Sequence, residues 1–277
     1  MNGSGTWTIG ALGKPITYSG TINGGKIVKT GIGLWTLTKA QSSLGGQTTV
    51  NEGVMNLNMP SSTTPCLGKY PIAITGSGIL TGRATVYSIN VNDGGVLRPG
   101  YYSITANYAY GALKATNGIF AYAGSTVKFW LRNAKGTDTS RSFLSTESSL
   151  VLEGDVVVEK VSSLNLKAGD SFTLWKAKSF SGTPSSLILP ELPAGLEWDT
   201  SKLYQPTGIL KVVVSTGISK ISANEEFEGT VYTLSGTKVG TLRTTKANMK
   251  ADLKALGIAD GVYIVRVAGE SIKVAIQ

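Results

Sequence analysis

The sequence holds few residues that could do chemistry in the usual ways. Among 277 residues there is no histidine and one cysteine, Cys66. Histidine is the usual general base for a serine or cysteine nucleophile and a common ligand of zinc, iron and copper. A single cysteine can form neither an internal disulfide nor a cysteine-only metal cluster. We therefore predict that Cys66 is a buried or half-buried thiol in a loop, without a catalytic role.

Carboxylates are the next candidates, because lyases and hydrolases that act on polysaccharides use clustered acidic residues, often with calcium. The acidic residues here occur singly in turn sequences, at Asp93, Asp155, Asp170, Asp199 and Asp260. Turn chemistry accounts for each of them. The one acidic cluster, Glu225-Glu226-Phe227-Glu228, is read as a solvated face. We predict that this chain is not an enzyme and has no catalytic residue, metal site or cofactor, although a catalytic domain could precede residue 1.

Two tryptophans are candidates for carbohydrate contact. The segment Thr126–Arg132 alternates, so Trp130 should face outward between Lys128 and Arg132, where its ring could stack on a sugar. Packing under a loop or against the next domain accounts better for Trp130. Trp35 is the second candidate. A carbohydrate role would require such aromatic side chains to be exposed in line on one face.

The chain carries 26 Lys and Arg against 17 Asp and Glu, a formal net charge of +9. This balance could favour acidic polysaccharide, a lipid surface or nucleic acid. The basic residues are scattered with no tract of four, so general solvation explains them better, and we expect no nucleic-acid partner. No run of about eighteen apolar residues occurs, so we expect no transmembrane helix.

The elements that would carry these residues are short strands separated by turns rich in glycine and asparagine. The stretch Gly31–Asn58 reads as strand, polar turn, strand, turn, strand, with one apolar side on each strand. Similar phrases recur along the first half of the chain, marked by glycines at intervals that scatter around the low twenties: Gly25, Gly53, Gly78, Gly95 and Gly118. Such intervals favour stacked coils over a sandwich, whose hairpin turns would follow one another at a much shorter spacing.

The residues TLTKAQSSLGGQTTVNEGVMNLN, from Thr36 to Asn58, resemble the autotransporter-associated β-strand repeat. The resemblance implies a parallel β-helix passenger displayed on the surface of a Gram-negative bacterium, and it implies no reaction. Residues 138–214 look like the closing rungs of such passengers, through the phrases Ala168–Leu174 and Gly195–Thr200. Trp175, Trp198 and Tyr204 are accordingly read as packing residues of a cap over the open end of the β-helix.

The last sixty or so residues differ in character and predict a compact antiparallel set of strands, with a short helix near Ala247–Leu256. VYTLSGTKVGTL (Val231–Leu242), the segment from Leu253 to Tyr263, and the final hairpin look like the type A sorting domain of type IX secretion. The resemblance implies recognition by the outer-membrane type IX translocon and surface-anchoring machinery. The motif falls on five residues, with Gly261 expected at a turn, Tyr263 and Val265 in the core and a basic surface feature at the lysine: Leu256, Gly261, Tyr263, Val265 and Lys273.

Together these observations predict an all-β chain with two domains. Residues 1–216 should form a right-handed parallel β-helix with capping rungs, and residues 217–277 a small antiparallel β-sandwich of the Ig-like kind. We expect the C-terminal part of a secreted, surface-displayed protein: an adhesin-like stalk that could touch a glycan or host surface, followed by a sorting signal. The alternatives are a non-catalytic tail of a polysaccharide lyase or glycoside hydrolase, and a carbohydrate-binding β-helix.

Overall fold

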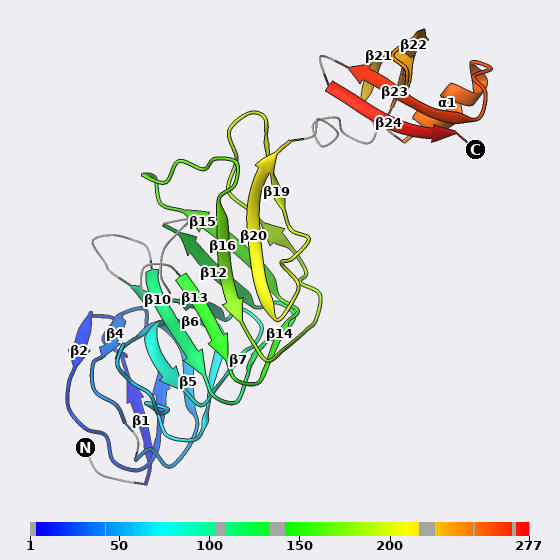
Figure 1. Cartoon of the computed structure of the whole chain (residues 1–277). Coiled ribbons are helices and arrows are strands. Elements are labelled where there is room, and N and C mark those ends of the chain that lie inside the picture. Colours follow the sequence, from blue (N-terminus) through cyan, green and yellow to red (C-terminus); the bar gives the residue numbers. More distant parts are fainter. Residues whose placement is uncertain are drawn as a thin grey trace. The chain divides into compact units, whose positions relative to one another are not determined.

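The computed structural model describes residues 4–41, 43–102, 109–132, 142–215, 225–245, 247–267 and 270–276. Within these residues the protein is all-β apart from one seven-residue helix (Figure 1). The chain divides into two compact units. The N-terminal unit comprises Met1–Glu191 with Trp198–Lys211, and the C-terminal unit Leu192–Glu197 with Val212–Gln277. No described helix is long and apolar enough to cross a membrane.

Twenty strands form one large sheet. Their bounds are β1 Thr6–Ile9, β2 Ile16–Tyr18, β3 Lys26–Lys29, β4 Leu34–Leu37, β5 Thr48–Asn58, β6 Pro71–Val86, β7 Ser88–Val91, β8 Val96–Pro99, β9 Tyr101–Tyr102, β10 Ala109–Ala115, β11 Ile119–Ala121, β12 Thr126–Leu131, β13 Ser142–Thr146, β14 Ser149–Leu152, β15 Asp155–Lys160, β16 Ser171–Lys176, β17 Ser179–Ser181, β18 Leu187–Ile188, β19 Leu196–Asp199 and β20 Thr207–Val214.

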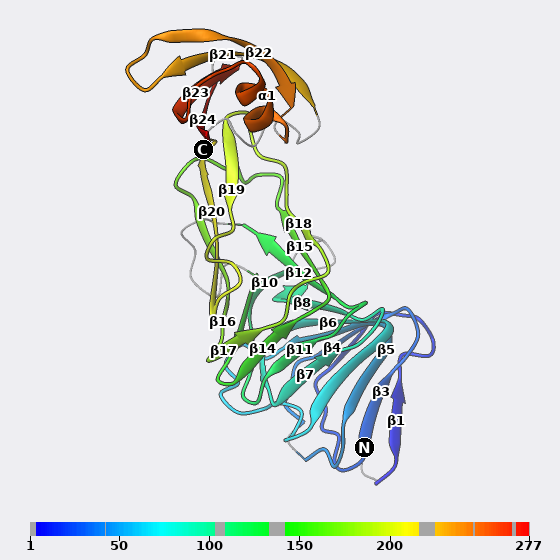
Figure 2. The same cartoon turned by 90° about the vertical axis from the view of Figure 1, so that its right-hand side faces the viewer.

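Most of these strands pair in parallel with a strand further along the chain. We call the stretch of chain between two positions paired in this way a coil. A first column runs β1, β3, the first half of β5 and of β6, β7, β11, β14 and β17 (Figure 2). A second runs β2, β4, the second halves of β5 and β6, β8, β12, β15 and β18. A third begins at the end of β6 and continues through β10, β13 and β16. The antiparallel strand β20 then pairs with β16.

Parallel register stacks like positions of successive coils into rows, and the inner rows form the core. In the first column a row of aliphatic side chains is completely or almost completely buried: Val50, Ile74, Val91, Ala121 and Leu152. The positions immediately before this row in β5, β7, β11 and β14 are half-buried, as expected for side chains that alternate along a strand. Burial of these rows supplies the main stabilisation of the unit.

The coils are not of constant length. The step from Ile72 to its partner Ile89 covers fewer residues than the step from Thr48 to its partner Ile72. The following step, from Ile89 to Ile119, is the longest of the three. The glycine markers give the correct step where Gly53 pairs directly with Gly78, but they overestimate the preceding step, in which Ile27 pairs with Thr48. They underestimate the step from Ile89 to Ile119, in which β8, β9 and β10 lie between the two paired positions.

The C-terminal unit contains one antiparallel sheet in the order β22-β21-β23-β24 and a short helix. The bounds are β21 Glu226–Thr233, β22 Lys238–Thr245, α1 Met249–Ala255, β23 Gly261–Val267 and β24 Glu270–Ile276. Met249 and Leu253, one turn apart on a single helix face, are buried in its core.

This unit corrects the prediction of a two-sheet sandwich. Its described residues form a single sheet, and α1 contacts β22 and β24. The helix provides the second apolar layer that an isolated four-stranded sheet needs. The predicted domain boundary, between residues 216 and 217, lies outside the described residues.

Candidate functional site

Cys66 lies in the loop between β5 and β6 and is fully buried. Its amide donates to the carbonyl of Thr85, and its own carbonyl accepts from the Gln41 amide. Burial raises the pKa of the thiol from 9.0 to about 12. The structure thus places Cys66 as predicted, in a loop, and as a protonated thiol at neutral pH it is a poor nucleophile.

We expect iodoacetamide to label Cys66 very slowly in the folded protein and readily in concentrated urea. The rise in the thiol pKa from 9.0 to about 12 corresponds to a roughly thousandfold lower thiolate fraction in the folded protein near pH 8. The measurement is the alkylation rate by mass spectrometry in both conditions. Equal rates would show that the loop opens freely.

The same shift gives a pH dependence. Above pH 9 the unfolded thiol loses its proton while the folded thiol keeps it up to about pH 12. The contribution of Cys66 to the free energy of unfolding is therefore fully present below pH 9. It decreases as pH rises from 9 to 12, by at most about 1.4 kcal/mol per pH unit. The difference between wild type and Cys66→Ala in urea unfolding should shrink across this window. A difference that stays constant would contradict the assignment.

Two of the acidic residues predicted in turns act within their own turns, whereas Asp155 begins β15 and its carboxylate accepts from the Ser186 hydroxyl at 2.7 Å. The Asp170 carboxylate accepts from the Lys167 amide at 2.9 Å, and the Asp199 carboxylate accepts from the Ser201 amide at 2.9 Å. The Ser201 hydrogen bonds lower the pKa of Asp199. Within the described residues no three acidic or cysteine side chains form a group that could hold a metal ion. In the cluster 225–228, Glu226 forms an exposed ion pair with Arg243 at 3.0 Å.

The two tryptophans proposed for carbohydrate contact differ in position. Trp35 is 2% exposed, because its register places it on the inner face beside Met55. The prediction for Trp35 was wrong: alternation within β4 turns this ring into the core, so no face is open to a sugar. Trp130 is half-buried, and the Lys128 ammonium lies 5.7 Å from its ring centroid. Lys128 is in turn paired with Glu159.

The aromatic residues near the last coils form a packed cluster. Trp175 is fully buried, stacks on Phe180 with ring centroids 5.7 Å apart, and donates from its indole nitrogen to the Gln205 carbonyl at 2.9 Å. Trp198 donates to the Pro190 carbonyl at 2.9 Å. The ring centroid of Tyr204 lies 6.3 Å from that of Phe180. The packing role predicted for Trp175 is confirmed by these contacts.

The five sorting-motif residues lie in the C-terminal unit but not at one point. Val265 is fully buried in the core, and Tyr263 packs against that core half-buried while its hydroxyl donates to the Ala259 carbonyl at 2.9 Å. Gly261 begins β23, Lys273 is exposed on β24, and Leu256 is the 55% exposed C-cap of α1. These positions match the expected core roles of Tyr263 and Val265 and the surface position of Lys273.

Sequence reasoning missed a buried lysine. Lys29 is fully buried in β3, and its ammonium donates to the carbonyls of Thr30, Gly31 and Glu52 at 2.9, 2.6 and 3.0 Å. Burial lowers the pKa of Lys29, and the Glu52 carboxylate opposes that lowering. The signal was available, since strand alternation puts Lys29 on the same face as Ile27.

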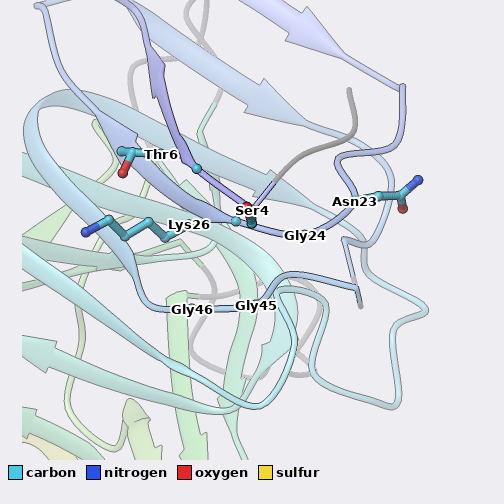
Figure 3. A pocket seen from close by; sticks show the side chains of 9 residues that line it. Ser4, Thr6, Asn23, Gly24, Lys26, Gly45 and Gly46 are labelled. Carbon is cyan, nitrogen blue, oxygen red and sulfur yellow. The ribbon is translucent and has the colours of Figure 1, made fainter.

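A wide groove of about 630 Å³ runs beside β1 and β3, lined by Ser4–Thr6, Asn23–Lys26, Gly45 and Gly46. The Asn23 and Lys26 side chains point in opposite directions there (Figure 3). Among the described residues that line it, the groove thus lacks convergent polar groups that would orient a ligand. No protein-family model matches the chain, and no curated protein matches it.

Proposed function

We propose that this chain is the C-terminal part of a secreted bacterial surface protein, with a right-handed parallel β-helix as stalk and a sorting domain for type IX secretion. The parallel columns of the N-terminal unit support the β-helix, because equivalent positions of successive coils are paired with each other as neighbouring parallel strands. Right-handedness is the expected hand for parallel crossovers. The role of the stalk is to present what is attached to it.

The observation that carries the sorting proposal is the independent core of the C-terminal unit. The phrases that resemble the type IX signal supply β21, β22, β23 and β24, which pack around Val231, Leu242, Val265 and Ile272. A translocon that reads a folded signal needs a unit able to fold without its cargo. Lys273, exposed on β24, offers the basic surface feature that the resemblance implies.

The test compares the full chain behind a signal peptide with a version ending at Val214, in a host with an intact type IX system. We expect the full form on the cell surface and the truncated form in the periplasm, measured by fractionation and surface protease digestion. A host lacking the translocon is the control. If both forms reach the surface equally, the segment after Val214 is not the address.

A further inference from the structure

The outer face of the third column carries a small pocket with two cations. It has a volume of about 110 Å³ and is lined by residues of β6, β10 and the loop after β5, among them Pro60, Ser62, Arg83, Thr85 and Lys114. Register pairs Lys114 with Thr85 on the neighbouring strand, close to Arg83 (Figure 1 shows β6 and β10). No carboxylate is among the described residues that line this pocket. Neither Arg83 nor Lys114 forms an ion pair within the described part of the chain.

Arg83 is held in place by neutral groups. Its Nε donates to the Asn58 side-chain oxygen at 3.0 Å, and its guanidinium lies 5.2 Å from the Tyr101 ring centroid and 6.0 Å from that of Tyr110. Its stem crosses Gly111, where a β-carbon would lie 3.2 Å from the arginine Cβ. Within the described residues the charge is therefore positioned without a paired carboxylate. A fixed guanidinium fork suits a carboxylate or sulfate group, which it binds through two hydrogen bonds.

The loop wall of the pocket is also ordered by hydrogen bonds. The Thr85 hydroxyl donates to the Ser62 carbonyl at 2.6 Å, and the Met59 amide donates to the Arg83 carbonyl at 2.9 Å. A volume of about 110 Å³ has room for roughly three or four waters. The pocket thus accepts an acidic group and excludes a whole sugar ring or base.

A second, open groove of about 480 Å³ adjoins the pocket and shares Pro60 and Ser62 with it. Its polar lining consists of hydroxyl and amide side chains: Thr38, Asn58, Ser61, Ser62, Thr63 and Thr64. Asn58 joins the two parts, since it lines the groove and holds Arg83. Such groups match the hydroxyls of a saccharide, and the volume lies in the range of small-ligand sites.

From these contacts we propose that the outer face of β5, β6 and β10 binds an acidic saccharide. Its carboxylate or sulfate lies between Arg83 and Lys114, and its hydroxyls lie in the groove from Asn58 to Thr64. Saccharide is favoured over nucleic acid because the neighbouring rings do not form a free stacking platform. Tyr110 already has two guanidinium groups near its ring, that of Arg83 and that of Arg132 at 5.1 Å. The proposal does not rest on the secretion role.

The test is calorimetric titration of the purified full chain with three hexasaccharide probes: galacturonate, its methyl ester, and a sulfated oligomer. We expect a carboxylated or sulfated probe to bind and the methyl ester to bind at least tenfold more weakly. Lys114→Gln should weaken binding of the acidic probe about tenfold, the loss of one hydrogen bond to a charged group, and Arg83→Gln, which removes two such bonds, should weaken it at least tenfold. Lys167→Gln, the same charge change at an exposed site away from the pocket, should leave affinity unchanged.

Circular dichroism melts check that each variant is folded, and Lys114→Gln carries the test if Arg83→Gln is not, because Lys114 is exposed. The proposal is overturned if neither acidic probe binds, if the methyl ester binds as well as the acid, or if Lys167→Gln weakens binding as much as Lys114→Gln. Equal binding of a single-stranded DNA of matched charge would also overturn it, since the face would then be a general polyanion surface.

Discussion

Replacing Lys29 by alanine should lower the free energy of unfolding of the N-terminal unit by about 3 kcal/mol or more, because it leaves buried hydrogen-bond acceptors unsatisfied and removes a large buried side chain. The Lys29 ammonium donates to three carbonyls that come from two successive coils, those of Thr30, Gly31 and Glu52. The Glu52 carboxylate in turn accepts from the Gly31 amide at 2.9 Å. Alanine would leave these acceptors without their donor and open a cavity between Ile9 and Val50 in the same row.

The measurement is the urea midpoint and slope for unfolding of the full chain. Lys26→Ala is the matched control, because Lys26 is exposed on the same strand, and it should change stability by less than about 0.5 kcal/mol. Lys29→Met keeps most of the side-chain volume but removes the hydrogen-bond donors. Its loss of stability therefore measures the hydrogen bonds, and the further loss in Lys29→Ala measures the cavity. Equal effects of Lys26→Ala and Lys29→Ala would refute the role assigned to the buried ammonium.

The sequence predicted the class of fold well because its signals are local. Alternation within strands and glycine at turns identify strands and coils without knowledge of contacts, and Gly53 and Gly78 pair as their spacing indicated. The C-terminal strands and the short helix were predicted for the same reason. What local signals do not contain is the number of strands per coil, which changes once β10 and β13 are added.

Side-chain environment was harder to predict. The sequence makes Trp35 a candidate for carbohydrate contact, but the parallel pairing of β4 with β5 places it beside Met55 on the inner face. Arg83 and Lys114, by contrast, are far apart in the sequence and become neighbours only through the pairing of β6 with β10. Their pocket also depends on a loop that begins at Met59. Such a site depends on long-range register, and a one-residue slip would turn every one of these side chains to the other face.

The second large effect is expected at Gly53, which follows the irregularity in β5 where that strand passes from the first column to the second. Gly53 has φ +66°, and a β-carbon there would lie 2.3 Å from the Gly31 carbonyl oxygen. Gly53→Ala should therefore cost about 1 kcal/mol for the left-handed backbone and about 1 to 3 kcal/mol more for displacing the neighbouring coil.

Gly169→Ala is the matched control for Gly53→Ala, since Gly169 has φ +91° but open space around its β-carbon position. It should show only the backbone cost, and the difference between the two variants in urea unfolding measures the contact between coils. Equal losses would mean that the coils separate without penalty.

The Gly31 carbonyl oxygen that Gly53→Ala would displace is also an acceptor of the Lys29 ammonium. The two substitutions therefore act on one contact between adjacent coils. We expect the double variant Lys29→Ala with Gly53→Ala to lose less stability than the sum of the single losses, by roughly 0.5 kcal/mol or more, the coupling typical of residues that share a partner. Strictly additive losses would instead show that the two substitutions affect independent contacts. Lys29 would then stabilise only the coil to which it belongs.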